Sequence, residues 1–377
     1  MTTVQSNPLS ERAFRIELLR DGSAEREACE RALANAGIRL PLPHRTGWTR
    51  VRRSTESVLV ALRAAGGDWV GAFGLHVAAS RALPGLRLLR VERFGEALPR
   101  ALWTAAVDAL GEVAREPRVL RLAVEVFSRD DNARAIMGEL LAGSGFVRAA
   151  ITRNWDRTLA LDLQPSESEL FASFSPTARR AIRAAANLPV QVRLIDDLTL
   201  GERLDALSCA AYARTGARYQ PLWNWPGVIE LAQRAPDASR LVGLFRTDQQ
   251  GPDALLGFAW GWWNGQSVSY FAGGSARPSD LQRVGIVHPL FWDLIVWAKR
   301  IGATWFDLGG VTAGTAGSGD PVGGISDFKR LFSKQTTNVA EDWVFEPRPV
   351  LARIAALVST GAGWLSRKAR RRPGDAP

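Results

Sequence analysis

The sequence predicts an α/β (α+β) fold with two similar domains. Its 377 residues exceed the length at which a single hydrophobic core usually stops growing. Hydrophobic residues make up 46% of the chain, which is enough for a core in each half. Apolar strands and amphipathic helices also recur in the same order in both halves, as expected for a duplicated unit. We therefore expect two tandem domains that share a cleft.

The first half, residues 1–157, alternates helices with short strands. Runs rich in β-branched and apolar residues predict strands, and apolar residues at helical spacing predict helices. Asp130 or Asp131 can cap the last helix, and Gly143 and Gly145 terminate it. The expected elements are a helix at 23–36, strands at 69–77 and 86–91, a helix at 99–115, a strand at 119–127 and the capped helix.

The second half, residues 187–349, repeats this order after a connecting segment at 158–186. Ser166 and Glu169 in this connection form a capping box. Ser175 and the proline that follows it then start a second, basic helix. The expected elements of the second half are a strand at 190–195, a helix at 198–215, strands at 241–245 and 255–263, a strand near 270, a helix at 290–301 and a strand at 304–308.

Composition limits the class of protein. The net charge of +10 and the pI near 10.6 favour a polyanionic partner such as RNA, a nucleotide-linked substrate or an anionic membrane, although an arginine-rich proteome explains them equally well. Cys29 and Cys209 are far apart, and the three histidines share no metal-ligand spacing. The N-terminal residues lack the apolar core of a signal peptide, and no window approaches the roughly 20 apolar residues of a membrane span. We therefore expect a cytoplasmic protein without a metal.

The stretch from Tyr270 to Lys329 carries the most specific motifs. A strand runs into GGS. Three further motifs follow in order: W-x-x-x-x-W-A-K, G-x-x-x-F-D-L-G-G and a glycine-rich loop that ends in F-K. This order resembles the second half of the Fem-type aminoacyltransferases (FemABX) of the GNAT acyltransferase superfamily. The strand T-x-x-x-D-L and the helix R-R-x-I-R-x-A in the connection also resemble that family. The resemblance covers about 119–331.

The resemblance implies a twin-GNAT enzyme that moves an amino acid from aminoacyl-tRNA to a peptidoglycan precursor, lipid II or UDP-linked, without a further cofactor. Lys329 then stabilises the oxyanion of the tetrahedral intermediate, since acyl transfer needs fixed positive charge there. Phe328 forms a wall of the site or is an ordinary core aromatic. Asp307 either orients the nucleophile or accepts hydrogen bonds from the glycine-rich backbone that follows it.

Further candidate residues are expected to bind substrates. Arg218 ends the segment Y-x-x-T-x-x-R, which resembles a family segment whose arginine contacts the phosphates of the precursor. The alternative role for Arg218 is a salt bridge. Tyr219 stands where the family continues with Asp-Gly-Phe, which leaves the acceptor open. Arg52 resembles a basic residue in the first domain of the Fem-type enzymes. The strand and its GGS turn contribute Tyr270, Gly273, Gly274 and Ser275, and the connecting helix presents Arg179, Arg180 and Arg183 to tRNA.

Two further candidate functions remain open. The turn Gln282-Arg283-Val284-Gly285 partly matches the pyrophosphate-binding turn of acetyltransferases, so an acyl-CoA N-acyltransferase is the second candidate. A catalytically silent binding module is the third.

Prolines between 212 and 240 exclude the long coiled-coil arm of the family. Residues 350–377 are expected to form a helix with a basic tail, which either lies on an anionic membrane or docks on the second domain.

Overall fold

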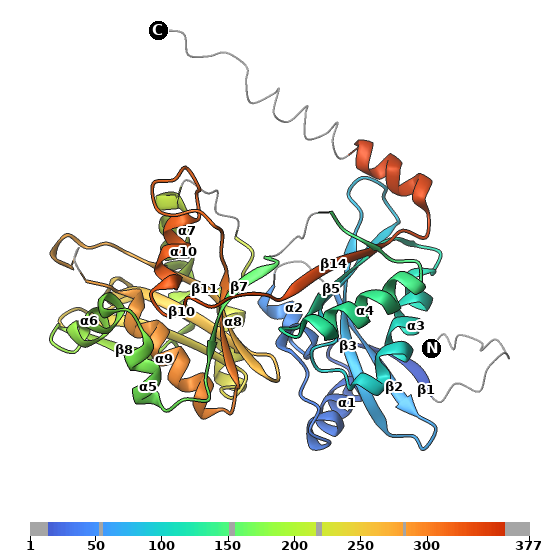
Figure 1. Cartoon of the computed structure of the whole chain (residues 1–377), viewed down its shortest axis with the longest axis horizontal. Coiled ribbons are helices and arrows are strands. Elements are labelled where there is room, and N and C mark those ends of the chain that lie inside the picture. Colours follow the sequence, from blue (N-terminus) through green and yellow to red (C-terminus); the bar gives the residue numbers. More distant parts are fainter. Residues whose placement is uncertain (1–13, 53–55, 151–154, 216–220, 282–283, 359–377) are drawn as a thin grey trace, which may run out of the picture.

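The computed structural model describes residues 14–52, 56–150, 155–215, 221–281 and 284–358. Two sheets of seven strands each lie side by side, and helices cover them (Figure 1). The predicted α/β class and the division into two similar units are therefore confirmed.

The first sheet has the strand order β1-β2-β3-β4-β5-β14-β6. Its strands are β1 (Phe14–Arg20), β2 (Glu56–Ala64), β3 (Trp69–Ala79), β4 (Arg87–Phe94), β5 (Val119–Phe127), β14 (Ala340–Phe345) and β6 (Val147–Arg148). Its helices are α1 (Ala24–Asn35), α2 (Trp48–Val51), α3 (Trp103–Ala114) and α4 (Asp131–Gly143), with 3-10 turns at Leu42–His44 and Arg100–Leu102.

The second sheet has the order β13-β7-β12-β11-β10-β9-β8. Its strands are β7 (Arg157–Asp162), β8 (Val190–Leu194), β9 (Ser239–Arg246), β10 (Leu255–Trp263), β11 (Ser267–Ser275), β12 (Trp305–Gly310) and β13 (Thr336–Asn338). Its helices are α5 (Glu167–Ser173), α6 (Pro176–Ala185), α7 (Gly201–Thr215), α8 (Trp225–Arg234), α9 (Val287–Arg300) and α10 (Gly323–Arg330), with 3-10 turns at Leu198–Leu200, Pro252–Ala254 and Ser279–Leu281.

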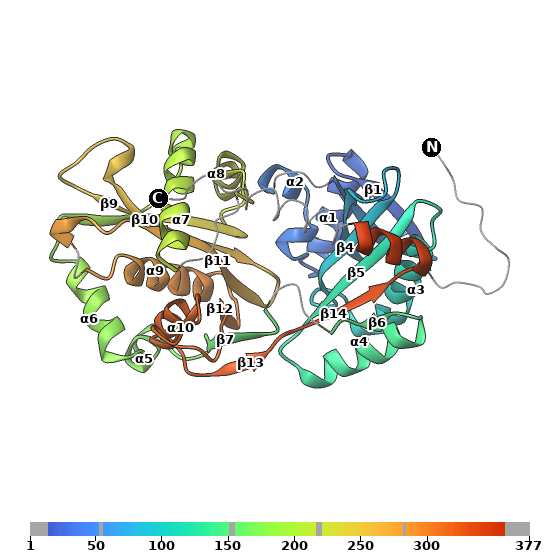
Figure 2. The ribbon, with the colours of Figure 1, turned by 90° about the horizontal axis from the view of Figure 1, so that it is seen from above.

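The two halves repeat one plan. In each, four strands are antiparallel neighbours, and the fourth is joined by a helix to a fifth strand that runs parallel to it. The crossover helix is α3 in the first half and α9 in the second. Figure 2 shows α9 and α10 on one face of the second sheet and α7 and α8 on the other. Separate hydrophobic clusters fill these two faces.

Two strands are exchanged between the halves. β7, which follows the first half in sequence, lies between β12 and β13 of the second sheet. β14, which follows the second half, returns to the first sheet and lies between β5 and β6 (Figure 1). The predicted boundaries therefore need correction: β7 is part of the second sheet and no mere connection, and the second half does not extend to residue 349. Sequence patterns could not show this, because they do not identify a strand's partner.

Local sequence signals explain the helix starts in the connecting segment. Ser166 accepts a hydrogen bond from the amide of Glu169, whose carboxylate in turn accepts from the Ser166 amide, so the predicted capping box is present. Ser175 caps α6 through the amide of Ala178, and a proline occupies the first turn. In the described part of 212–240, the helix after the gap at 216–220 is the ten-residue α8, which is far shorter than a coiled-coil arm.

The C-terminal helix, residues 349–358, packs on the first half. Ala352 and Ala355 are buried with Leu120 of β5, so the alternative in which this helix docks on the second domain is wrong. The return of β14 to the first sheet explains this placement. The opposite face of the helix exposes large apolar side chains: Val350, Ile354, Leu357 and Val358. No helix in the described ranges has the length and hydrophobicity that a membrane crossing requires.

Candidate active site

The parallel strands β11 and β12 separate partway along their length. They pair from Ser267 with Trp305 to Ser269 with Asp307, and the register records no further pair between them. On its other side β12 pairs with β7 from Trp305 to Gly310, and the register of that pairing shifts between Asp307 and Gly310, which pairs with Thr158. The backbone edges of the two strands are thus released at the same end of the sheet. Such an opening places main-chain groups where a ligand can reach them.

Asp307 holds the turn that follows the separation point. Its Oδ1 accepts a hydrogen bond from the Gly309 amide at 2.8 Å and another from the Thr158 hydroxyl. Its Oδ2 accepts from the Ser269 hydroxyl at 3.1 Å. The side chain is only 6% exposed. Two roles were considered for Asp307. Its geometry supports the structural role, in which it accepts hydrogen bonds from the glycine-rich backbone.

Lys329 of α10 reaches this turn. Its Nζ donates to the carbonyl of Gly310 at 2.8 Å, and the side chain is 6% exposed. Burial lowers the pKa of Lys329 to about 8, although the nearby Asp307 carboxylate acts in the opposite direction. Gly309 has a φ of +83°, and a Cβ there would lie 3.0 Å from the lysine Nζ. A glycine is therefore required both for the turn and for the ammonium beside it. Lys329 is thus a buried lysine and not a solvated surface side chain.

Aromatic rings surround the ammonium. The Tyr270 ring centroid lies 5.9 Å from the Lys329 Nζ and 4.4 Å from that of Phe291. Phe328 is half-buried and packs edge-on against Phe291 at 5.0 Å. Burial raises the pKa of the Tyr270 hydroxyl, which therefore stays protonated. Phe328 thus packs against the core and is also partly exposed. That it forms a wall of the active site stays a prediction.

Trp155 is a residue that the sequence analysis missed. A Cβ added to Gly310 would fall 1.7 Å from the Trp155 Cγ, so the indole lies directly against the backbone whose carbonyl binds Lys329. The side chain is nevertheless 47% exposed. An exposed indole beside the opening offers a face on which a base or sugar can stack. The sequence offered no signal for it, because Trp155 lies outside the matched motifs.

The glycines of the GGS turn have a packing role. A Cβ on Gly274 would lie 2.6 Å from the Leu207 carbonyl group of α7, and one on Gly273 would lie 2.4 Å from the Tyr270 hydroxyl oxygen. Ser275 accepts hydrogen bonds from Arg214 of α7 through its carbonyl, at 2.8 Å, and its hydroxyl. These glycines therefore bring β11 close to its own helix. A direct contact with substrate stays a prediction for them.

A second feature is an open cavity of about 420 Å³ where α2 of the first half meets α8 of the second. Arg52 lines it and forms a β-bridge with Trp223. Arg52 also donates to Glu92 at 2.9 Å. Burial alone would raise the pKa of Glu92, but the guanidinium groups of Arg90 and Arg52 hold this pKa at about 2. The cavity is lined by Thr49, Arg50, Arg52, Asn224, Pro226, Gly227 and Glu230.

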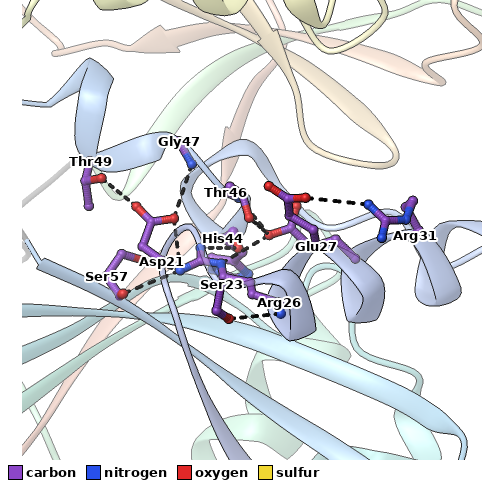
Figure 3. A network of polar contacts seen from close by, with 11 residues as sticks. Asp21, Ser23, Arg26, Glu27, Arg31, His44, Thr46, Gly47, Thr49 and Ser57 are labelled. Atoms are coloured by element: carbon purple, nitrogen blue, oxygen red, sulfur yellow. Dashed lines mark hydrogen bonds and ion pairs between the residues drawn. The ribbon is translucent and has the colours of Figure 1, made fainter.

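A buried polar network supports the segment that carries α2 (Figure 3). Arg26 is completely buried and forms an ion pair with Asp21 at 3.4 Å. It also donates to the Ser57 hydroxyl at 3.3 Å and to the His44 carbonyl at 3.1 Å. Thr49 in turn donates to Asp21 at 2.5 Å. The cavity wall is thereby fixed to the first sheet.

The basic helix α6 leaves its cations available. Arg180 and Arg183 are exposed and Arg179 is half-buried, and none of them forms an ion pair with a carboxylate of the described residues. Arg183 lies over the Phe171 ring at 5.1 Å. α6 packs near the N-terminus of α9, where a Cβ on Gly285 would lie 2.9 Å from that of Ala181. Arg218 and Tyr219 lie outside the described residues.

The turn before α9 bears on the acyl-CoA alternative. The amide of Val284 donates to Leu281, that of Ile286 to Val284, and that of His288 to Gly285. Pyrophosphate binding at a helix start requires amides that point at the anion without an internal partner. Three amides of this turn are thus already used. Gln282 and Arg283 lie outside the described ranges. In those ranges, no three His, Cys, Asp or Glu side chains gather in a group able to hold a metal ion.

Residues 172–330 match the family model of an acetyltransferase (GNAT) domain. The fold of the whole chain is similar to that of FemX, with 13% identity, coverage of 90% of this chain and 100% of that one, and a TM-score of 0.67. These findings support an acyltransferase with a FemABX-type GNAT fold.

Two further solved structures show weaker similarity. A tandem GNAT protein from the clavulanic acid biosynthesis pathway is 15% identical, with 88% and 99% of the two chains covered and a TM-score of 0.44. The C-terminal domain of a putative lysylphosphatidylglycerol synthetase from Agrobacterium fabrum is 12% identical, with 89% and 96% covered and a TM-score of 0.46. No curated protein matches the chain by sequence.

Proposed function

We propose that this acyltransferase moves an aminoacyl group from tRNA to an amine of a peptidoglycan precursor. The observation that carries the proposal is the buried ammonium of Lys329 at the opening between β11 and β12. An ammonium has three donors, and Gly310 is its hydrogen-bond acceptor among the described residues. The remaining donors can therefore bind an oxygen of the substrate.

In the proposed reaction, the acceptor amine attacks the ester carbonyl carbon that links the amino acid to the terminal ribose of tRNA. The carbonyl oxygen becomes an oxyanion, and Lys329 stabilises it by donating a hydrogen bond. The ester C–O bond then breaks, an amide C–N bond remains, and the ribose hydroxyl leaves with the proton lost by the amine. Because Asp307 already accepts three hydrogen bonds, we assign the base to the substrates' own groups.

The donor is proposed to bind along α6 and across the opening. The unpaired cations of Arg179, Arg180 and Arg183 suit the phosphates of an RNA acceptor stem. The exposed face of Trp155 suits stacking on the terminal nucleoside, next to the carbonyl that holds Lys329. This arrangement brings the aminoacyl ester to the ammonium.

The acceptor is proposed to enter through the cavity between α2 and α8. Arg50 and Arg52 line that cavity, and guanidinium groups suit the pyrophosphate of a lipid-linked or UDP-linked precursor. Glu92 is shared by Arg52 and Arg90, so a net positive charge remains beside the cavity. Arg218 is proposed to add a further phosphate contact.

The protein is proposed to act in the cytoplasm at the inner face of the membrane. The C-terminal helix exposes Val350, Ile354, Leu357 and Val358 and buries Ala352 and Ala355 on its other face. The sequence that follows carries Arg367, Lys368, Arg370, Arg371 and Arg372. An apolar helix face next to a basic segment is suited to an anionic lipid surface.

Product masses test the proposed function. The protein is incubated with a pool of charged tRNAs and either lipid II or the UDP-linked precursor, and in parallel with acetyl-CoA and the same acceptors. We expect a mass increase of one amino acid residue only with charged tRNA. Acetylated product and tight CoA binding would replace the proposal with the acyl-CoA alternative. No product with any donor would favour the silent binding module.

A further inference from the structure

Arg93 of β4 has an unusual backbone and an unusual position. Its φ is +51°, and it is the one residue other than glycine with a positive φ among the described residues. The register of β4 with β5 shifts between Val91 and Phe94, so a bulge contains Arg93. The side chain is 7% exposed and belongs to the first half of the chain. A left-handed arginine in a strand persists only where surrounding contacts fix it.

The Arg93 guanidinium bridges the two halves. Two of its nitrogens bind the Glu96 carboxylate at 2.5 and 2.9 Å, and its carbon lies 3.6 Å from the Phe127 ring centroid. From this fixed position it donates to the hydroxyls of Ser267 at 3.2 Å and Ser269 at 3.4 Å. Both serines belong to β11 of the second half, on the residues that pair with β12.

The contacts continue from these serines to the candidate site. Ser269 donates to Asp307, and Asp307 accepts from the Gly309 amide in the turn before Gly310. The Gly310 carbonyl accepts from Lys329. An unbroken series of short polar contacts therefore leads from the first half to the ammonium. Asp307 also stabilises the positive charge of Arg93, so the carboxylate lies between two cations.

We propose that Arg93 is a positioning residue through which the first half of the chain holds the Asp307 turn, and with it Lys329, in the geometry required for transfer. The inference rests on the proposed function of Lys329. Glu96 alone would satisfy the charge of Arg93, but it would not explain the contacts with both serines across the boundary. Arginine is required because its planar fork reaches the carboxylate and two hydroxyls together, which lysine cannot do.

The small number of lysines permits a test that does not depend on catalysis. Lysine occurs at four positions, 299, 329, 334 and 368. In protein labelled with ¹³C-lysine, the Cε resonances report each lysine pKa, and Lys329→Met identifies the signal of Lys329. We expect Arg93→Met to raise the pKa of Lys329 by about one unit, because the turn that buries the ammonium loosens and the Asp307 carboxylate no longer has Arg93 as a second cation. Arg93→Lys should raise it as well.

A matched control is Arg121→Met. Arg121 lies on the same strand as Phe127, and the substitution breaks its ion pair with Glu346. Arg121 lies six residues from Phe127, about 20 Å along the strand. This control should leave the Lys329 titration unchanged. An unchanged titration in Arg93→Met would overturn the inference. Full recovery in Arg93→Lys would also overturn it, because charge alone would then suffice.

If Arg93→Met does not fold, Ser269→Ala tests the same connection, since it removes the contact and keeps the Arg93 ion pair with Glu96. We expect a smaller rise of the Lys329 pKa, and no rise would refute the connection. In a transfer assay Ser269→Ala should lower kcat with little change in acceptor KM. If Lys329→Met is fully active, the proposed role of Lys329 fails while the titration still decides whether Arg93 controls its position.

Discussion

Lys329 is unusual because lysine is rare in a chain with 48 basic residues. Arginine remains charged when it is buried, whereas a lysine pKa falls readily. Burial lowers the pKa of Lys329 to about 8. At neutral pH the side chain is therefore still mostly protonated and can donate to an oxyanion. This capacity is lost progressively as the pH rises through 8.

The first prediction concerns Lys329→Met. Loss of one oxyanion donor should reduce transfer by roughly 10²–10³-fold. The folded protein should not become less stable, because a charged lysine with a pKa of about 8 instead of 10.5 opposes folding by about 3 kcal/mol at neutral pH. The measurements are transfer rate and chemical denaturation, with Lys334→Met, an exposed lysine five residues away, as the control. Near-normal turnover in Lys329→Met would remove this residue from the mechanism.

The second prediction concerns pH. The unfolded lysine has a pKa near 10.5, and the folded one has a pKa of about 8. Between these values the unfolded state binds more protons, so the free energy of unfolding should rise from pH 8 to 10.5, and Lys329→Met should lack this rise. The transfer rate should fall over the start of the same range, because the donor loses its proton. A rate that increases through pH 8 would instead indicate a lysine that acts as a base.

At the residue scale, the sequence identified side chains inside short motifs. Lys329, Asp307 and the glycines were found because their spacing along the chain is specific. Trp155 and Arg93 were missed, because their roles arise from contacts with residues about 155 and 175 positions away along the chain, and no local pattern records such contacts.

At the scale of single elements, α6 is suited to binding RNA because its cations have no carboxylate partners in the described ranges. The third prediction is that charge reversal of Arg179, Arg180 and Arg183 weakens tRNA binding and reduces the slope of log K against log salt by about 2 to 3. Binding is measured by filter retention or anisotropy over a salt series. A charge-matched control reverses three exposed arginines of the first half, Arg81, Arg87 and Arg118. Equal losses in both variants would mean that net charge, not α6, controls binding.

Most elements followed from local sequence. Helix caps at Ser166 and Ser175 and apolar periodicity in α9 were visible because they depend on neighbours within a few residues. The exchange of β7 and β14 was not visible, since an apolar strand of six residues fits either sheet. The bulge in β12 beyond Asp307 was not visible either, because it appears only in the pairing of β12 with β7.

At the scale of the whole molecule, the C-terminal helix gives the fourth prediction. Truncation after Pro349 should abolish co-sedimentation with anionic liposomes, because it removes the exposed apolar face and the basic segment together. Truncation after Val358 keeps the helix and should retain partial binding. Activity on a lipid-linked acceptor should fall, while a water-soluble acceptor is processed as before. Liposome binding that survives truncation after Pro349 would contradict the membrane proposal.

The exchanged strands have a consequence for how the protein is made. During synthesis the first half leaves the ribosome with β5 and β6 complete but with the position between them empty, because β14 lies almost 200 residues later in the chain. Until residues 340–345 emerge, the nascent first sheet therefore ends at an unpaired edge of β5, and β6 has no partner strand. Closure of that sheet and completion of the segment bearing Lys329 fall at the same stage of translation. A prematurely terminated chain should consequently be both inactive and prone to aggregate.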